Sequence, residues 1–250
     1  MADLFRVEGR VACVTGASGG LGRAIATALA ERGASVIGVA RRAEALEAWR
    51  AQAGGKTAAV VADVSDPAKA SAIAAQCAAP FGSPDILINA AGINTRQIAD
   101  DVTLEGWQLT LDLNLAAPFF LAQAMVPAMK AKGWGRIVNF ASLQSTRAFP
   151  GGLSYGASKG GISQLTRAMA EAWSSDGITA NALAPGFFHT ELTEAVFADP
   201  ERAARNAANT CAGRNGTMED IIGPALFLCS PASDYVTGQM LAVDGGFTAK

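Results

Sequence analysis

Tyr155 and Lys159 lie four residues apart in the stretch LSYGASKGG (153–161) of a 250-residue chain whose only histidine is His189. Unperturbed, a tyrosine hydroxyl titrates near pH ~10 and a lysine near pH ~10.4. On a helix, positions i and i+4 share a face, so the ammonium group would lie beside the phenol. At about 4 Å and an effective dielectric near ~20, that charge favours the phenolate by roughly 4 kcal/mol, or up to about 3 pKa units. The spacing therefore predicts a tyrosine that transfers protons near neutral pH, and we expect His189 to be an ordinary loop residue.

A glycine-rich turn near the N-terminus predicts a dinucleotide-binding site. The sequence TGASGGLG (15–22) follows an apolar strand-like segment and opens a helix-length one. Glycines allow a tight turn and close approach of the backbone to a phosphate, and the helix N-terminus offers free N–H groups and a partial positive charge. The residues expected to contact the cofactor in this turn are Gly16, Ser18, Gly20, Leu21 and Gly22.

The residues after the second strand-like segment indicate which cofactor binds. A chain that prefers NAD usually has an acidic residue there, which accepts from the ribose 2′-hydroxyl. This chain has Ala40 followed by Arg41 and Arg42, and guanidinium groups bind phosphate with bidentate geometry. The sequence therefore predicts NADP, with NAD as the alternative cofactor. Solvent-exposed arginines at a helix start are the competing interpretation.

Two further strand ends are expected to contact the cofactor, because an open α/β sheet binds ligands at the carboxyl ends of its strands. Asp63 and Val64 end the third strand-like segment, where the carboxylate could accept from the adenine amino group. The sequence NAAG ends the fourth, and its small residues leave backbone room beside the cofactor. The contacts predicted there are Asn89, Ala91 and Gly92.

These motifs require a parallel sheet that brings them together. Short segments that are mostly apolar on both faces alternate with helix-length amphipathic segments, which predicts an α/β fold: one Rossmann-type domain (1–250) with a doubly wound parallel sheet of about seven strands. The strand-like segments are 11–15, 35–39, 57–62, 85–89, 136–140, 179–183 and 240–244. The segment 186–216 is too long for an ordinary connection and has helical patterning, which predicts a small helical lid insertion.

Composition argues against several classes of protein. The formal charge of -2 and the pI near 5.5 leave no basic excess for nucleic acid. The start, MADLFRVEGRVACVTG, lacks the layout of a signal peptide, and no 18-residue apolar stretch suggests a membrane span. The four cysteines lack the paired spacing of a zinc site, so we expect buried free thiols and no metal. These observations predict a soluble, cytoplasmic protein without nucleic-acid or membrane partners.

Together these residues resemble the short-chain dehydrogenases/reductases over essentially the whole chain. One departure is Asn89-Ala90, where the family usually has two asparagines. The resemblance implies an oxidoreductase that transfers a hydride between NAD(P)(H) and a small-molecule carbonyl or secondary alcohol. It rests on TGxxxGxG (15–22), the Asn-Ala-Gly element (89–92), Asn114, Ser142, YxxxK (155–159), Pro185-Gly186, Thr190 and VDGG (243–246).

The resemblance implies a Ser-Tyr-Lys-Asn catalytic set. Ser142 would hydrogen-bond the substrate oxygen, Tyr155 would act as general base or acid, and Lys159 would also hold the nicotinamide ribose. Asn114 would kink its helix and anchor a water beside the lysine. Taken singly, Tyr155 could be a surface aromatic, Ser142 a helix cap and Asn114 a hydrogen-bonded polar group in a helix. The catalytic interpretation therefore rests on the order and spacing of the residues as a set. Tyr155 and Lys159 are also expected cofactor contacts, as are Pro185, Gly186, Phe188 and Thr190 beside the carboxamide.

Three stretches resemble the gluconate 5-dehydrogenase branch, which interconverts gluconate and its 5-keto acid: GINTR (92–96), ASLQS (141–145) and GFFHTELT (186–193). A sugar acid needs a cation for its carboxylate and several hydrogen bonds for its hydroxyls. Phenylalanines would add apolar wall, which leaves a bulkier ketone or a 3-oxoacyl thioester as the alternative substrate. A non-catalytic dinucleotide sensor is a third interpretation, disfavoured by the intact catalytic set. The candidate substrate contacts are Arg96, Ser142, Gln144, Arg147, Phe149 and Phe187.

Two predicted helices, at about 107–132 and 154–176, carry broad apolar and small-residue faces. Those faces exceed what one side of a sheet needs to cover. The resemblance implies that they pair between subunits, which would give a homotetramer with two-fold interfaces.

Overall fold

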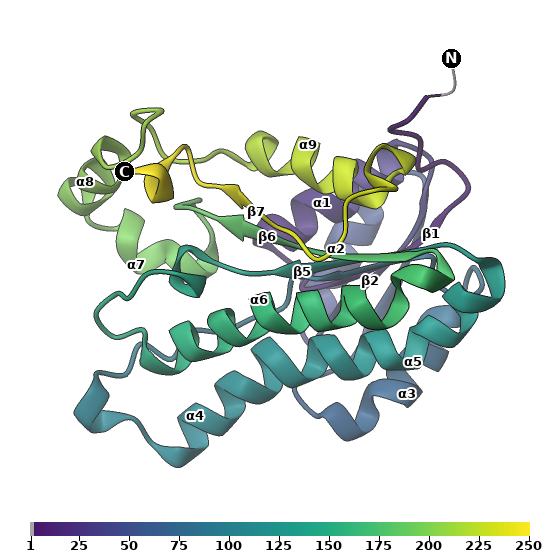
Figure 1. The fold of residues 1–250 in the computed structure, drawn as a ribbon, viewed down its shortest axis with the longest axis horizontal. Helices are drawn as coiled ribbons and strands as arrows, with labels where there is room; N and C mark the ends of the chain where they lie inside the picture. Colours follow the sequence, from purple (N-terminus) through teal and green to yellow (C-terminus); the bar gives the residue numbers. More distant parts are fainter. Residues whose placement is uncertain (1–2) are drawn as a thin grey trace.

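Seven parallel strands form one sheet at the centre of the protein (Figure 1). The computed structural model describes residues 3–250, and the strands run in the order β3-β2-β1-β4-β5-β6-β7. This order confirms the predicted doubly wound fold, and each strand begins and ends within two residues of its predicted range. The strands are β1 (Val11–Thr15), β2 (Ser35–Ala40), β3 (Lys56–Val61), β4 (Ile86–Asn89), β5 (Gly135–Phe140), β6 (Ile178–Pro185) and β7 (Met240–Val243).

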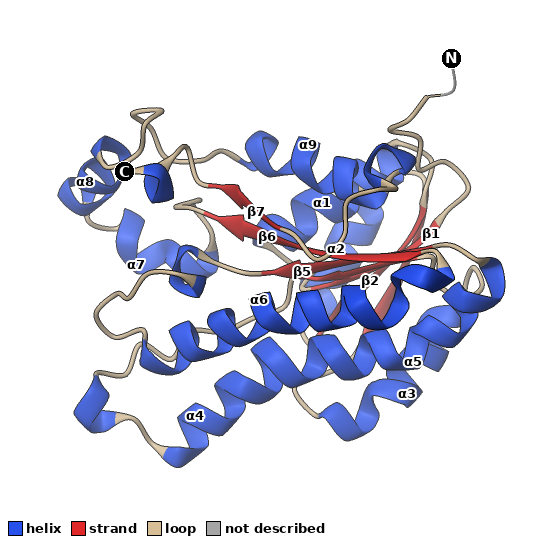
Figure 2. Ribbon diagram, in the orientation of Figure 1, coloured by secondary structure: helices blue, strands red, loops and turns tan. Residues whose placement is uncertain are grey.

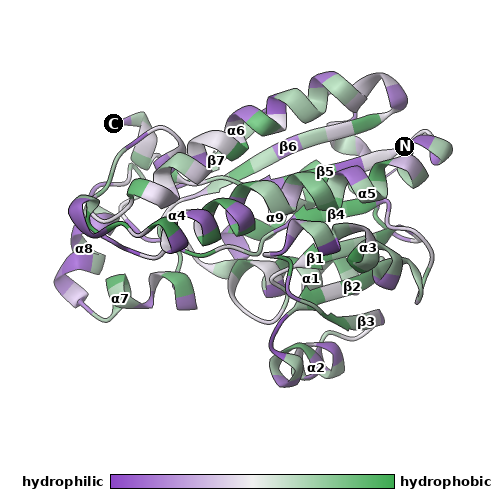
Figure 3. Cartoon of the chain, turned by 90° about the horizontal axis from the view of Figure 1, so that it is seen from below, coloured by the Kyte–Doolittle hydropathy of each residue, from purple (hydrophilic) through white to green (hydrophobic). Residues whose placement is uncertain are grey.

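Helices cover both faces of the sheet, which is why the central strands are apolar on both sides (Figures 2 and 3). Leu29 and Trp49 are fully buried on one face, and Leu121 and Met125 are buried on the other. The first face carries α1 (Gly20–Glu31), α2 (Ala43–Gln52) and α9 (Met218–Cys229). The second carries α3 (Ala70–Ala78), α4 (Leu104–Leu111), α5 (Ala117–Lys132) and α6 (Leu153–Trp173).

The strand order reverses at β1, which pairs with β2 on one side and β4 on the other. Open α/β sheets bind ligands outside the carboxyl ends of the strands at such a point. Thr15 and Asn89 end β1 and β4 in register. The Thr15 hydroxyl accepts from the backbone N–H of Ala91 at 3.1 Å, so the loop after β4 is held against the glycine-rich turn.

The segment Leu104–Lys132 is a continuous helical stretch in which the π-helical Asp112–Ala116 joins α4 to α5. By length and composition it could cross a membrane, with a mean hydropathy of 1.4 over an 18-residue window. Half of this apolar window is buried inside the protein. Its burial against the sheet explains why the helix is so apolar.

The segment between β6 and α9 forms the predicted helical insertion. It begins with a short 3-10 turn, Glu191–Thr193, which we call the strap, and continues into α7 (Glu194–Phe197) and α8 (Pro200–Ala208). Asp199 caps α8. The chain then returns to the sheet at Gly216, which bridges to Phe188. In Figure 1, α7 and α8 lie beyond the carboxyl ends of β6 and β7.

The four cysteines are free thiols. Cys13, Cys77 and Cys229 are buried, as the sequence predicted, whereas Cys211 is exposed after α8, so the expectation was wrong there. The Cys13 and Cys77 sulfurs lie 3.7 Å apart in the core of the second face.

Candidate functional site

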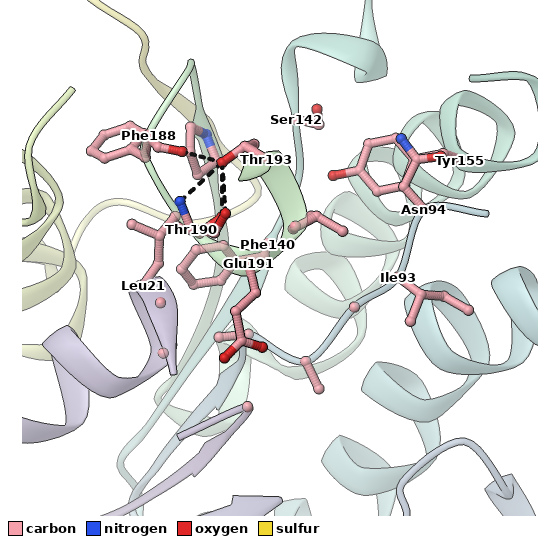
Figure 4. A pocket seen from close by; sticks show the side chains of 18 of the residues that line it. Leu21, Ile93, Asn94, Phe140, Ser142, Tyr155, Phe188, Thr190, Glu191 and Thr193 are labelled. Carbon is pink, nitrogen blue, oxygen red and sulfur yellow. Dashed lines mark hydrogen bonds between the residues drawn. The ribbon is translucent and has the colours of Figure 1, made fainter. Parts of the chain in front are cut away.

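A cavity of about 620 Å³ runs along the carboxyl ends of the strands. Its wall combines the glycine-rich turn, the ends of β2 and β3, the loop after β4, the serine segment, the start of α6 and the strap. Of the predicted site residues, all line this cavity except Asn89, Asn114 and Arg147. Figure 4 shows Ser142 and Tyr155 across the cavity from Thr190 and Glu191.

The nucleotide end depends on close approach between backbone segments. A Cβ atom on Gly22 would lie 2.6 Å from the Gly16 carbonyl oxygen, and one on Gly16 would lie 2.9 Å from the Ala91 nitrogen. Gly16 also has a φ of 74°, which favours glycine. Within residues 3–250, no side chain caps the N-terminus of α1. Its first residues, Gly20 to Gly22, line the cavity, so their free N–H groups can bind an anion.

Both predicted phosphate-binding arginines line the cavity, and both have partners. Arg41 lies 3.8 Å from the Asp63 carboxylate. Arg42 donates to Glu191 of the strap at 2.8 Å and to the Ser18 hydroxyl at 3.1 Å. These guanidinium groups are about half exposed, so they remain accessible to a phosphate.

Tyr155 and Lys159 are buried on the face of α6 that meets the cavity. The Lys159 ammonium donates to the Phe140 carbonyl oxygen at 2.6 Å and lies 5.5 Å from the centre of the Tyr155 ring. Ser145 links this helix to the serine segment: its hydroxyl donates to the Lys159 carbonyl oxygen and accepts from the Ser142 N–H. Ser142, Tyr155 and Lys159 are therefore held together at one end of the cavity.

Burial dominates the electrostatics of this pair. Burial lowers the pKa of Lys159 to about 8. Burial raises the pKa of Tyr155 and outweighs the Ser142 hydroxyl and the Arg96 charge, which lower it. The prediction that Lys159 would bring the pKa of Tyr155 toward neutrality is therefore wrong for the protein chain by itself, because desolvation exceeds the attraction of a lysine that points at Phe140.

Asn114 lies behind the cavity wall, not in it. Its side-chain oxygen accepts from the Ile93 N–H at 3.0 Å, and its amide donates to the Ile93 carbonyl oxygen at 2.9 Å and to Ser158 at 3.1 Å. It occupies the π-helical turn, a distortion often found at functional sites. Asn114 is thus a positioning residue, which fixes the loop after β4 against the helix that carries Tyr155.

The substrate end brings together four predicted contacts. Arg96 adopts a φ of 53°, and its guanidinium donates to the Leu192 carbonyl oxygen of the strap at 2.6 Å. The side-chain oxygen of Gln144 is buried and has no donor within residues 3–250. Phe149 and Phe187 pack edge to face, with ring centroids 6.3 Å apart. This end therefore combines a cation and a free acceptor with an apolar wall.

Two predicted ligand contacts lie outside the cavity wall, with their side chains bound to other partners. The Asn89 amide donates to Asn139 at 2.9 Å inside the sheet, where an asparagine between buried strands finds its partner. Arg147 turns to the C-terminal segment, where it donates to the Thr248 and Lys250 carbonyl oxygens and lies over the Phe247 ring.

The insertion contributes residues that the sequence did not single out. Thr193 hydrogen-bonds Thr190 and the Phe188 carbonyl oxygen (Figure 4), and the strap thereby orients the segment after β6. His189, as expected, is a loop residue outside the cavity wall, beside Glu194 at 3.0 Å. The unpredicted cavity residues of the insertion are Glu191, Leu192, Thr193, Val196, Arg202 and Asn206.

The known proteins to which this chain is similar are dehydrogenases and reductases. A family model described as enoyl-(acyl carrier protein) reductase matches residues 16–248. Gluconate 5-dehydrogenase of Gluconobacter oxydans (strain 621H) is 41% identical over 249 residues, 98% of this chain and 97% of that protein. A 3-oxoacyl-[acyl-carrier-protein] reductase of Vibrio cholerae is 38% identical, with 97% and 98% covered. The crystal structure of a gluconate 5-dehydrogenase from Burkholderia cenocepacia J2315 in complex with NADP and tartrate superimposes with a TM-score of 0.93 at 38% identity, covering 99% of this chain and 98% of that one.

Proposed function

This chain belongs to the short-chain dehydrogenase/reductase family and is an oxidoreductase of CH–OH groups, and we propose that it interconverts gluconate and its 5-keto acid with NADP(H). One observation carries the proposal. Ser142, Tyr155 and Lys159 line the same cavity as the glycine-rich turn and the two arginines that follow β2.

The chain's own residues would move the proton while the nicotinamide ring accepts or donates the hydride. Tyr155 would take the proton of the C5 hydroxyl in oxidation and return it in reduction. Ser142 would hold the same substrate oxygen. Lys159, whose burial lowers its pKa to about 8, would bind the ribose hydroxyls and favour the phenolate together with the positive charge of the oxidised ring.

NADP fits the nucleotide end better than NAD. Arg41 and Arg42 line the cavity after β2, where they would bind the 2′-phosphate. Asp63 and Val64 would border the adenine, and the segment from Pro185 to Thr190 would hold the carboxamide. The relative from Burkholderia cenocepacia carries NADP in its crystal structure.

A sugar acid suits the substrate end because Arg96 and Gln144 offer hydrogen-bond donors and an acceptor to its several hydroxyl groups. The relative from Burkholderia cenocepacia holds tartrate, a small hydroxy acid, together with NADP. The second candidate substrate is a 3-oxoacyl thioester or another bulky ketone. The packed rings of Phe149 and Phe187 favour it, as does the similarity to the reductase of Vibrio cholerae.

Turnover of a substrate panel in both directions, with NADP and with NAD, tests the proposal. Gluconate and 5-ketogluconate should give the highest kcat/KM, and NADP should exceed NAD. A higher kcat/KM for a 3-oxoacyl thioester would contradict the substrate assignment. Cofactor binding without turnover of any carbonyl or alcohol would indicate a dinucleotide sensor instead.

We also propose that the insertion acts as a lid and that the enzyme works as a homotetramer in the cytoplasm. The strap and α8 both contribute to the cavity wall, which supports the lid. Leu104, Leu109 and Phe120 of the long helical stretch are 82%, 42% and 39% exposed, which supports burial between subunits. A monomer in light scattering at micromolar concentration would exclude the tetramer.

A further inference from the structure

Helix α8 presents two polar side chains to the cavity that no step of the proposed reaction uses. Arg202 and Asn206 both line the cavity. They are four residues apart in α8, so they share one face of the helix. Arg205 of the same helix is outside the cavity wall, and it lies 3.6 Å from Glu201.

Both side chains have unused hydrogen-bonding capacity. The amide nitrogen of Asn206 is buried and has no acceptor within residues 3–250, and buried polar groups without partners are rare in folded proteins. Within the same residues, no carboxylate forms an ion pair with the Arg202 guanidinium, and the backbone N–H of Arg202 donates to Asp199. A buried free donor beside an unpaired cation is suited to an anionic group.

Arg96 is placed at the reacting end of the substrate. Its guanidinium is bound to the Leu192 carbonyl oxygen, and its charge acts on Tyr155. The carboxylate of gluconate is separated from C5, the carbon proposed to react, by four carbon–carbon bonds. An arginine beside Tyr155 therefore lies near the C5 hydroxyl, and the carboxylate needs a cation further away.

The terminal segment links the C-terminal end of α8 to the substrate end of the cavity. The Lys250 ammonium donates to the carbonyl oxygens of Ala208, the last residue of α8, and of Thr210, two positions after it. Phe247, in the same terminal segment, packs against the substrate wall: its ring centroid is 6.2 Å from that of Phe149 and 5.6 Å from that of Phe187.

We propose that Arg202 and Asn206 bind the carboxylate of the sugar acid. The guanidinium would form charge-assisted hydrogen bonds to the carboxylate, and the Asn206 amide nitrogen would find there the acceptor that it lacks in the chain. The inference rests on the proposed function and adds to it the residues that select an acid over a neutral polyol. It places this selection on the insertion, away from the residues that handle the proton.

The test compares Arg202→Met with Arg205→Met in the full-length enzyme. Methionine is long, uncharged and a good helix former, so both variants should fold. We expect Arg202→Met to raise KM for gluconate roughly 10- to 100-fold, since a hydrogen bond to a charged group contributes about that factor. Arg205→Met should leave it unchanged. Gluconamide, which has an uncharged amide in place of the carboxylate, should show the same KM or inhibition constant with all three proteins.

Binding of NADPH, followed by its fluorescence, should be equal in the three proteins. Equal KM values for gluconate in the two variants would overturn the carboxylate assignment, as would equal losses for gluconate and gluconamide. An unmutated enzyme that turns over neither gluconate nor 5-ketogluconate would overturn the proposed function itself, and the assignment of the carboxylate with it.

Discussion

At the glycine-rich turn of the nucleotide end, backbone atoms approach so closely that side chains are excluded, whereas at the substrate end of the cavity side chains from separate loops meet. Gly16 and Gly22 belong to one turn, and a Cβ on Gly22 would collide with the Gly16 carbonyl oxygen at 2.6 Å. Arg96, Gln144 and Phe187 come from three different strand ends. The first end is specified by a contiguous motif, and the second by how the whole chain packs.

This difference separates the two things that the site must do. The nucleotide end recognises a ligand that is the same in every turnover, so a rigid backbone cradle suffices. The substrate end must discriminate among small polar molecules, and it does so with side chains that can change without disturbing the sheet. Four substitutions or measurements test that separation, and the largest effect is expected at Tyr155.

The largest effect should come from Tyr155→Phe, which removes the transferable proton and leaves the glycine-rich turn unchanged. We expect kcat to fall about 10²- to 10⁴-fold, with the Kd for NADPH unchanged when measured by fluorescence titration. Retention of more than about a tenth of kcat would exclude Tyr155 as the general acid–base group. Weakened NADPH binding of similar size would show that the two ends are not separable.

Burial of Lys159 should make stability depend on pH. Its folded pKa is about 8 and its ordinary value is near ~10.5, so between these values the unfolded chain binds more protons than the folded one. The free energy of unfolding attributable to Lys159 should therefore rise with pH across this window, by roughly 3 kcal/mol in all. Below pH 8 the full penalty of the buried charge remains.

Lys159→Met provides the comparison, because it removes this charge and keeps the length of the side chain. Denaturant unfolding of both proteins from pH 7.5 to 9.5 should show a steeper rise for the unmutated enzyme. The difference between the two isolates the lysine from Cys13 and Cys229, whose raised pKa values act in the opposite direction. Identical slopes would contradict a buried ammonium group.

Gly22→Ala should damage the nucleotide end alone. The added methyl group must displace the Gly16 carbonyl, so we expect a loss of about 1–3 kcal/mol in stability and in NADPH binding. Gly223→Ala is the matched control, because a Cβ there meets nothing within 4 Å in the middle of α9 and should stabilise the helix slightly. Equal melting temperatures and NADPH affinities in the two variants would show that the turn tolerates a side chain.

The last prediction concerns Arg41, which acts on one group of the cofactor. Arg41→Ala should lower kcat/KM for NADP by about 10- to 100-fold relative to NAD, because a charged hydrogen bond contributes ~1.5–3 kcal/mol. Arg50→Ala, in which the lost arginine pairs with Glu47 on the outer side of α2, should change neither. Equal or better kcat/KM with NAD in the unmutated enzyme would show that these arginines merely face solvent.

The sheet and the nucleotide end could be predicted because their signals are local. A strand buried in a parallel sheet, such as β1, is apolar on both faces, and this pattern is visible within the strand itself. The spacing of Gly16, Gly20 and Gly22 likewise predicts the phosphate-binding turn without any information from the rest of the chain. The same contiguous spacing placed Tyr155 and Lys159 on one helix face. Local patterns failed for Asn89 and Arg147, because only packing decides toward which neighbour a side chain turns.

The insertion was the least predictable part of the site. Glu191 meets Arg42 across 149 positions of the chain, and no pattern in the residues near either one signals that contact. Arg202 and Asn206 read as solvent-facing residues of a short amphipathic helix until α8 is placed against the cavity. A polar pair at helical spacing inside a segment too long for a connection was the available signal.

The strap links the two ends of the cavity, because arginines from different loops bind adjacent residues in it: Arg42 binds Glu191 and Arg96 binds the Leu192 carbonyl. A cofactor phosphate that binds Arg42, or a substrate group that binds Arg96, therefore acts on the same three-residue segment. Thermodynamic linkage requires any such effect to be reciprocal: the factor by which NADP alters the affinity for substrate equals the factor by which substrate alters the affinity for NADP. An exposed ion pair contributes only about 0–1 kcal/mol. Replacing Glu191 by the phosphate as the partner of Arg42 can therefore change the affinity for the other ligand only a few-fold.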